Sequence, residues 1–182
     1  MTRWLGLLRG INVSGTRKLP MVELRALCGE LGFTDAKTYI ASGNVMFSSA
    51  DQAETVTNAL EKGIADRFGF SCDVIVRSAA QWRTHLENNP FANDETIVPK
   101  MLHIMLSRHP LKPGAVDVIR ERLSPTERIR ASGGVLWIDY GESGVARSKL
   151  TPSFLDKTAG STVTGRNLNT AEMLDQLLNG TT

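Results

Sequence analysis

ASGNVMF at residues 41–47 returns as ASGGVLW at residues 131–137. Alanine, serine, glycine and valine are identical in the two copies, and the two residues after the valine form the similar pairs Met/Leu and Phe/Trp. AKTYI and NVMFS flank the first turn, and ERIR and VLWIDY flank the second, a pattern typical of a β-hairpin. A match at the same hairpin in both halves of the chain predicts an internal repeat.

Around the first copy, the chain predicts the order β-α-β-β-α-β. WLGLLR (4–9) is a short apolar run bounded by glycine and is typical of a buried strand. Pro20 suits the first turn of a helix, and apolar residues recur behind it at helical spacing. A second helix ends at Gly69, and CDVIV (72–76) predicts the fourth strand.

Around the second copy, the same order is expected. MLHIMLS (101–107) predicts a strand, and Pro113 opens the helix that follows it. Thr151 and Pro152 suit the N-cap and first position of another helix, and STVT (161–164) predicts the last strand.

Two further helices are predicted from capping patterns. Ser78 with Gln81 forms a capping box for a short connecting helix after the first unit. Asn169 with Glu172 is expected to cap a final helix near the C-terminus.

We therefore predict an α+β fold of two tandem ferredoxin-like (α-β plait) units related by internal duplication. The first unit with its connecting helix spans residues 1–89, PFANDETIVP (90–99) is a linker, and the second unit with a terminal helix spans residues 100–182. WLGLL and MLHIML are apolar on both faces, so the sheet face away from the helices must also be covered. The sister unit, a terminal helix or a second subunit in a homodimer could cover it, which argues against an open RNA-reading sheet.

Composition narrows the class of protein. The chain has 182 residues, 41% of them hydrophobic, and a net charge of +2, which is too small for non-specific binding to polyanions. Cys28 and Cys72 lie in apolar segments and suggest core thiols in a reducing, cytoplasmic setting. The first apolar run is too short for a signal peptide or a membrane span, so no membrane partner is expected.

The N-terminal loop RGINVSGTRK (9–18) is the first candidate site. Gly10 and Gly15 have the spacing of a P-loop, but Thr16 and Arg17 stand where lysine and serine or threonine should follow. We interpret the loop more broadly: it leads into a helix N-terminus, which favours anions, and its basic residues add charge. A flexible, solvated loop is the alternative.

Two C-terminal segments repeat this arrangement. RSKLTPSF (147–154) places Arg147 and Lys149 just before a helix, and TGRNLNT (164–170) places Arg166 before another. If these segments converge on the N-terminal loop, an anion pocket forms between the units. The candidate ligand-binding residues are Arg9, Asn12, Lys18, Ser42, Asn44, Lys149, Arg166 and Asn167, and the alternative for the asparagines is a local role in turns and caps.

The ligand expected for this pocket is a phosphate-containing metabolite, a nucleotide or a nucleic-acid end. A cofactor-independent enzyme acting on an anionic substrate is the second hypothesis, with Glu23 and Asp139 as carboxylates placed only by their position in the fold. A protein-interaction scaffold is the third. The three histidines lack carboxylate or cysteine neighbours at metal spacing, so neither a metal nor a cofactor is expected.

LLRGINVSGTRKLPMVELRAL, YIASGNVMF, RSKLT and TGRNLNT together resemble the bacterial family called domain of unknown function 1697. These motifs extend over nearly the whole chain. The resemblance implies a tandem α-β plait fold and supplies no reaction. Leu168 stands where the family often has an aromatic residue, so the resemblance implies no stacking role there.

Overall fold

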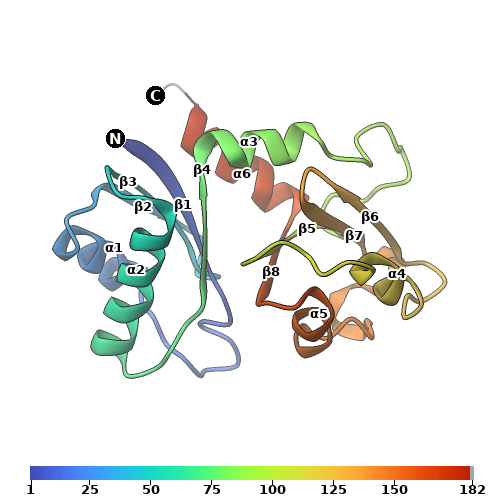
Figure 1. Ribbon diagram of the computed structural model, residues 1–182, viewed down its shortest axis with the longest axis horizontal. Coiled ribbons are helices and arrows are strands. Elements are labelled where there is room, and N and C mark those ends of the chain that lie inside the picture. Colours follow the sequence, from blue (N-terminus) through green and yellow to red (C-terminus); the bar gives the residue numbers. More distant parts are fainter. Residues whose placement is uncertain (181–182) are drawn as a thin grey trace. The chain divides into compact units, whose positions relative to one another are not determined.

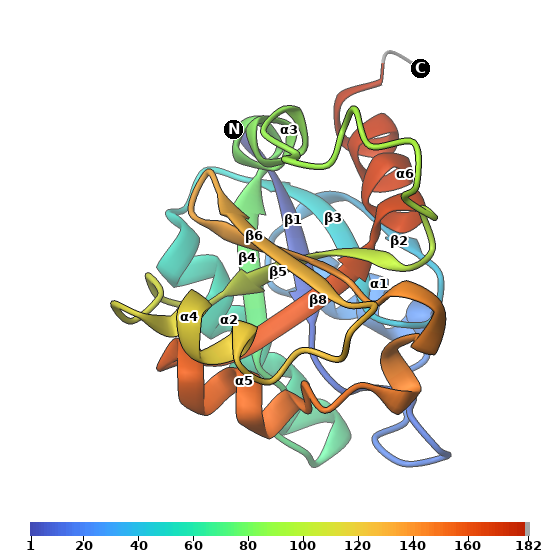
Figure 2. The same ribbon diagram turned by 90° about the vertical axis from the view of Figure 1, so that its right-hand side faces the viewer.

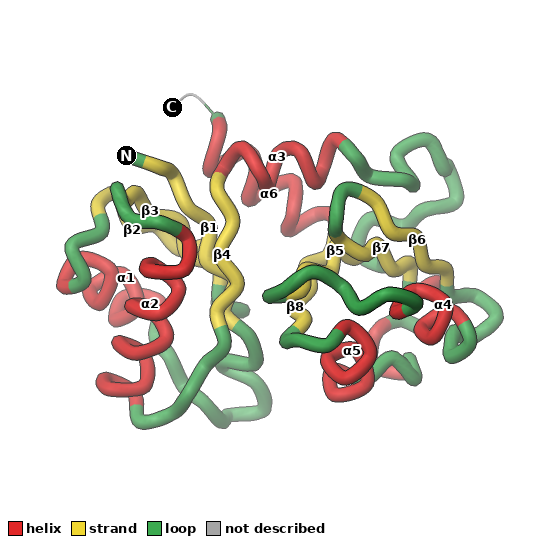
Figure 3. The backbone as a smooth tube through the Cα atoms, viewed as in Figure 1, coloured by secondary structure: helices red, strands yellow, loops and turns green. Residues whose placement is uncertain are grey.

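The computed structural model describes residues 1–180, which form two compact units. Unit 1 comprises Met1–Trp82 together with the chain from Asp175 onward, and unit 2 comprises Arg83–Leu174. Each unit is a mixed α+β structure with one four-stranded antiparallel sheet (Figures 1 and 3).

The two units present their elements in the same order. Unit 1 contains β1 (Thr2–Leu8), α1 (Met21–Glu30), β2 (Thr34–Tyr39), β3 (Asn44–Ser49), α2 (Ala53–Phe68) and β4 (Val74–Ser78). Unit 2 contains β5 (Leu102–Ser107), α4 (Ala115–Arg120), β6 (Arg128–Ser132), β7 (Val135–Asp139), two 3-10 turns η1 (Gly141–Ser143) and η2 (Val145–Arg147), α5 (Pro152–Ala159) and β8 (Val163–Asn167). Helices α3 (Ala79–Glu87) and α6 (Leu168–Asn179) follow β4 and β8, and the unit boundaries fall within them.

The strand orders are β2-β3-β1-β4 and β6-β7-β5-β8, so the first strand of each unit pairs with its third and fourth strands. The two hairpins differ in register. Tyr39 pairs with Asn44 across a four-residue turn, whereas Ser132 pairs with Val135 across a two-residue turn. As a result, Phe47 belongs to the core under α1 and α2, whereas Trp137, its counterpart in the sequence repeat, lies on the other face of its sheet.

Helices cover one face of each sheet. In unit 1, α1 and α2 pack their apolar residues, such as Leu24 and Leu60, against Trp4 and Phe47 (Figure 1). In unit 2, α4 and α5 lie together over the sheet, and Ile119 and Leu155 complete the core (Figure 2). The helix spacing predicted from sequence is confirmed by these buried positions.

The other face of each sheet is buried as well. Leu5 and Met46 are fully buried in unit 1 although they point away from α1 and α2, and Ile104 and Trp137 are fully buried in unit 2 on the face away from α4 and α5. The expectation that both faces are covered is thus confirmed. A sheet buried in this way offers no open surface for stacking bases.

The predicted element boundaries need several corrections. Helix α6 begins at Leu168, and its cap is Asn167, whose Oδ1 accepts a hydrogen bond from the N–H of Thr170 at 2.9 Å. The prediction that Asn169 caps this helix is wrong because β8 runs directly into the helix and leaves Asn167 at the junction. Pro20 is the N-cap residue and not the first helical residue. The capping box is confirmed: the N–H of Gln81 donates to Ser78 Oγ at 3.2 Å, and Gln81 Oε1 accepts from the N–H of Ser78 at 2.9 Å.

The segment predicted to be a linker lies within unit 2. Phe91 is 2% exposed there, which shows that this part of the chain is anchored by an aromatic side chain. In Figure 3 the segment follows α3 as a long green loop without helix or strand. Whether residues 1–89 and 100–182 fold independently stays a prediction.

Candidate functional site

The N-terminal loop connects β1 to α1 and is held at both ends by buried side chains. Ile11 is 2% exposed and Leu19 is fully buried, whereas residues 12–18 between them are exposed. The backbone N–H of Asn12 donates to the carbonyl of Arg17 at 3.1 Å, and that of Thr16 donates to Val13 at 3.0 Å. The loop is therefore folded back on itself and presented to solvent by two apolar anchors.

Several residues of this loop have left-handed backbone. The φ angles of Asn12, Ser14 and Arg17 are 53°, 49° and 50°, and those of Gly10 and Gly15 are positive as well. Asparagine tolerates this region, but serine and arginine occupy it at a cost of about 1–3 kcal/mol each. Backbone strain of this kind persists only where surrounding contacts enforce it, and it concentrates at functional sites.

The contacts that enforce this conformation come from Asn12 and Arg17. Asn12 Nδ2 donates to the carbonyls of Leu19 at 3.0 Å and Ala41 at 2.8 Å, and its Oδ1 accepts from the N–H of Leu19 at 2.8 Å. The guanidinium of Arg17 donates to the carbonyls of Gly10 and Ser71 and lies 5.6 Å from the centre of the Phe70 ring. Arg17 is thus engaged in shaping the loop.

The remaining basic residues of the loop differ in exposure. Lys18 is exposed, and in residues 1–180 its ammonium forms no hydrogen bond or ion pair. Arg9 is half-buried, and its backbone N–H donates to the carbonyl of Asp73 at 3.0 Å. Lys18 is therefore the cation that the exposed segment offers to a ligand.

Ser42 and Asn44 lie in the neighbouring hairpin. Asn44 is fully buried, and its Nδ2 donates to the carbonyl of Tyr39 at 2.9 Å and to Ser42 Oγ at 3.2 Å. These bonds close the turn between β2 and β3. Asn44 therefore has the local turn role that the sequence analysis gave as the alternative to ligand binding. The bond from Asn12 to Ala41 joins this turn to the N-terminal loop, so in unit 1 the structure brings Asn12, Ser42 and Asn44 together.

The unit 2 candidates have separate surroundings. Arg166 is 8% exposed, and its Nη1 donates to Thr164 Oγ1 at 3.1 Å and to the carbonyl of Gly165 at 2.8 Å. Asn167 is used as a helix cap. Lys149 is exposed and has no hydrogen bond or ion pair within the described residues. Hence no hydrogen bond or ion pair links Lys149 to Arg166.

The two carboxylates considered for catalysis are engaged by arginines. Glu23 accepts from Arg67 at 2.7 Å on the surface of unit 1. Asp139 is 4% exposed, and its Oδ2 accepts two hydrogen bonds from the Arg128 guanidinium at 2.7 and 3.0 Å, while Oδ1 accepts from the N–H of Gly141 at 3.1 Å. Both oxygens of Asp139 are therefore held by donors from unit 2.

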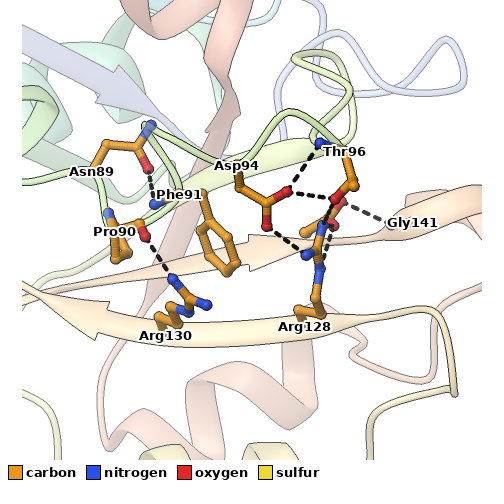
Figure 4. Close-up of polar contacts among 9 residues, drawn as sticks. Asn89, Pro90, Phe91, Asp94, Thr96, Arg128, Arg130 and Gly141 are labelled. Atoms are coloured by element: carbon orange, nitrogen blue, oxygen red, sulfur yellow. Dashed lines mark hydrogen bonds and ion pairs between the residues drawn. The ribbon is translucent and has the colours of Figure 1, made fainter.

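Arg128 is the centre of a cluster that the sequence did not reveal (Figure 4). Besides Asp139, it contacts Asp94 at 2.7 Å and Thr96 at 3.1 Å, and these two residues come from the segment predicted as a linker. Arg130, two positions along β6, stacks at 4.5 Å on Phe91 and donates to the carbonyl of Pro90 at 2.6 Å. The cluster therefore pins residues 90–96 to the edge strand of the second sheet.

The electrostatics of this cluster follow from its hydrogen bonds. The hydrogen bonds between Arg128 and Asp139 raise the pKa of Arg128 most. The negative charges of Asp139 and Asp94 raise it further. Hydrogen bonds from Thr96, followed by the charge of Arg128, lower the pKa of Asp94. The partners are 34 and 11 residues from Arg128 in the chain, so no local spacing could have identified them.

Within residues 1–180, no three His, Cys, Asp or Glu side chains gather in a way that could hold a metal ion. None of the described helices is long and apolar enough to cross a membrane.

Comparison with known proteins gives a family but no activity. A search of curated proteins finds no match. The conserved bacterial protein SP0830 from Streptococcus pneumoniae has a similar structure, with a TM-score of 0.76 and 26% sequence identity over 98% of this chain and 99% of that one. Residues 1–137 match the family model described as "Protein of unknown function (DUF1697)". Because that match extends over most of the chain, the protein belongs to the DUF1697 family, as its motifs suggested.

Proposed function

We propose that this protein binds an anionic, phosphate-containing ligand, and that the exposed N-terminal loop of unit 1 is a principal contact. The observation that carries the proposal is the backbone of residues 10–17, which holds non-glycine residues at positive φ in a solvent-exposed segment. Backbone N–H groups in mixed right- and left-handed conformations form concave nests that bind anions. Lys18 adds an exposed charge next to them.

The helix that follows the loop supports the same chemistry. The N-cap of α1 is Pro20, which provides no side-chain hydrogen bond to the first turn. The first N–H groups of a helix lack intrahelical partners, and the helix dipole favours negative charge beside them. Glu23 in this first turn is paired with Arg67, which offsets its repulsion of an anion.

Calorimetric titration with phosphate, pyrophosphate, AMP and a 5′-phosphorylated dinucleotide tests this proposal. We expect Lys18→Ala to weaken binding about tenfold, as expected for the loss of one charged hydrogen bond. Lys62→Ala is the matched control because Lys62 is a surface lysine of unit 1 that pairs with Asp66. Saturable binding that Lys18→Ala leaves unchanged, or no binding of any of the four ligands, would remove the loop from the proposal.

The unit 2 residues Lys149 and Arg166 are tested in the same titration. Lys149→Ala probes an exposed cation, whereas Arg166→Lys keeps the charge of a buried one. If both sets of residues contact one ligand, Lys149→Ala weakens the binding of the same ligand that Lys18→Ala weakens. Binding at the loop that Lys149→Ala and Arg166→Lys leave unchanged would restrict the site to unit 1.

A cofactor-independent enzyme is the second candidate, and His103 is the observation that favours it. Burial lowers the pKa of His103, its Nδ1 lies 3.1 Å from the carbonyl of Met101, and the charge of Arg166 lowers the pKa further. A histidine that is neutral near pH 7 can act as a base. Turnover of a phosphate-ester substrate that survives in His103→Gln would remove this candidate.

We also propose that the two units are ferredoxin-like and arose by duplication. The shared order of elements and the shared strand order support this. Arg77 and Arg166 add to the support: each precedes a helix-capping residue and donates its Nη1 to the carbonyl of the residue before it, at 2.9 and 2.8 Å.

The setting of the protein completes the proposal. Cys28 and Cys72 are both free and buried, as expected of a bacterial protein that works in the reducing cytoplasm. A homodimer stays a prediction, which sedimentation velocity over a range of concentrations tests directly.

A further inference from the structure

Unit 2 contains a cavity of about 490 Å³ beside α4 and α5, well away in sequence from the N-terminal loop. Its lining residues are Lys112, Pro113, Gly114, Ala115, Val118, Arg122, Phe154, Lys157 and Thr158. The volume falls within the range of small-molecule sites, about 300–1,000 Å³. We refer to it as the α4–α5 cavity.

The lining of the α4–α5 cavity carries only positive charge. It includes Lys112, Arg122 and Lys157 and no carboxylate. In residues 1–180, none of these three side chains forms a hydrogen bond or ion pair. This sets them apart from Arg120 at the end of α4, which pairs with Asp117 at 2.6 Å. Three unpaired cations around one hollow form a local field that favours an anion.

Two of the three cations are held in place. The guanidinium of Arg122 lies 4.4 Å from the centre of the Phe154 ring, a cation–π contact. Its N–H groups lie in the guanidinium plane and stay available to bind an oxyanion in a bidentate manner. The stem of Lys112 passes over Gly160, where a Cβ would come within 2.5 Å of Lys112 Cε.

Helix electrostatics explain part of this arrangement. Lys112 and Lys157 lie near the C-terminus of α5, where cations are favourable. That effect does not require Arg122 to stack on Phe154 at the rim of the cavity. Phe154 and the exposed Val118 also give the cavity an apolar wall, which a bare inorganic anion would leave uncovered.

We infer that the α4–α5 cavity is a binding site for a phosphorylated small molecule with an aromatic group, of the nucleoside diphosphate class. Lys112, Arg122 and Lys157 would contact the phosphates, and Phe154 with Val118 would contact the ring. This site is separate from the N-terminal loop and does not rest on the function proposed for that loop.

Titration calorimetry with ADP and with pyrophosphate tests the inference. We expect Lys157→Ala and Lys112→Ala each to weaken ADP binding about tenfold. Arg122→Lys keeps the charge but removes the planar guanidinium, which can bind two oxygens at once and contact the Phe154 ring. We expect it to weaken ADP binding about fivefold. Phe154→Leu should weaken ADP more than pyrophosphate, because only ADP has a ring to contact. Thermal unfolding of each variant establishes that it is folded.

Arg120→Ala is the matched control, since it removes one positive charge from α4 without touching the cavity. Lys62→Ala, which removes a surface charge of unit 1 that pairs with Asp66, is a second control and should leave ADP binding unchanged. Equal losses in Arg120→Ala and Lys157→Ala would show a general charge effect and overturn the inference. ADP binding that no cavity variant weakens, or no ADP binding at all, would overturn it as well.

Discussion

Asn12 and Leu19 form a reciprocal pair: the amide of Asn12 accepts from the N–H of Leu19 at 2.8 Å and donates to its carbonyl at 3.0 Å. This pair closes the N-terminal loop across the residues between them. A third bond, from Asn12 to the carbonyl of Ala41 at 2.8 Å, fastens the closed loop to the hairpin. One side chain thus determines the shape of the whole exposed segment.

We predict that Asn12→Ala lowers the free energy of unfolding by about 2 kcal/mol, from the loss of these hydrogen bonds and of a residue tolerant of positive φ. Asn12→Asp keeps the side-chain oxygen that accepts from the N–H of Leu19, so it should lower the free energy of unfolding by less than Asn12→Ala does. Urea denaturation checks both values. Lys18→Ala, in the same loop, should leave stability unchanged, and a comparable loss in that variant would contradict the role assigned to Asn12.

Gly43 gives a prediction about close packing. Its φ is +93°, and an added Cβ would lie 2.8 Å from Leu8 Cβ, whereas a Cβ on Gly15, with φ +75°, would meet no atom within 4 Å. Both alanine variants suffer backbone strain of about 1 kcal/mol, but only Gly43→Ala adds a clash worth about 1–3 kcal/mol. Chemical denaturation should therefore rank Gly43→Ala as clearly the less stable. Equal stabilities would show that Leu8 moves aside freely.

The Asp94 carboxylate predicts a loss of stability in acid. Hydrogen bonds from Thr96 and the charge of Arg128 hold its pKa below the usual 3.8 of an aspartate, so its contribution to stability is present above that value and is lost as the pH falls through the lower, folded-state pKa. At neutral pH, Asp94→Asn should be less stable than the wild type, and the difference should shrink toward pH 2.5. Denaturation at each pH measures this, with Glu95→Gln from the same loop as control. A difference that does not depend on pH would exclude Asp94 as its source.

The cysteines predict slow thiol chemistry in the folded protein. Burial raises the pKa of Cys28 to about 12 and that of Cys72 to about 11. Because the thiolate is the reactive form, iodoacetamide at pH 8 should label neither residue in the native state and both in denaturant. Mass spectrometry counts the labels. Rapid native labelling of Cys72 would mean that the segment around Arg9 opens readily, since Cys72 Sγ contacts the carbonyl of Arg9 at 3.5 Å.

How far the sequence predicts this structure depends on the range of the interactions. Hairpins, helix ends at Gly69 and Gly160, and the capping box of Ser78 arise from neighbouring residues, and the chain pattern predicts them well. The sequence predicts the cap of α6 at Asn169 and not at Asn167, where the structure has it. Both asparagines suit a cap, and the end of β8 decides between them. The Arg128 cluster and the α4–α5 cavity depend on residues that only folding brings together.

Sequence reasoning gave Asn44 two roles, a ligand contact and a turn residue, and its amide donates to the carbonyl of Tyr39 in its own turn. Buried asparagine and ligand-binding asparagine look the same in a single sequence, because both follow glycine in a turn. The structure separates them by solvent exposure and hydrogen-bond partners.

The bonding of Arg17 has a consequence for the kinetics of association. Its partners, the carbonyls of Gly10 and Ser71, are neutral, so Arg17 keeps its charge and acts on a distant anion together with Lys18. At physiological ionic strength such a field decays within about 8 Å. An anionic ligand should therefore associate faster when salt is removed, because the field of the two cations then reaches farther from the loop.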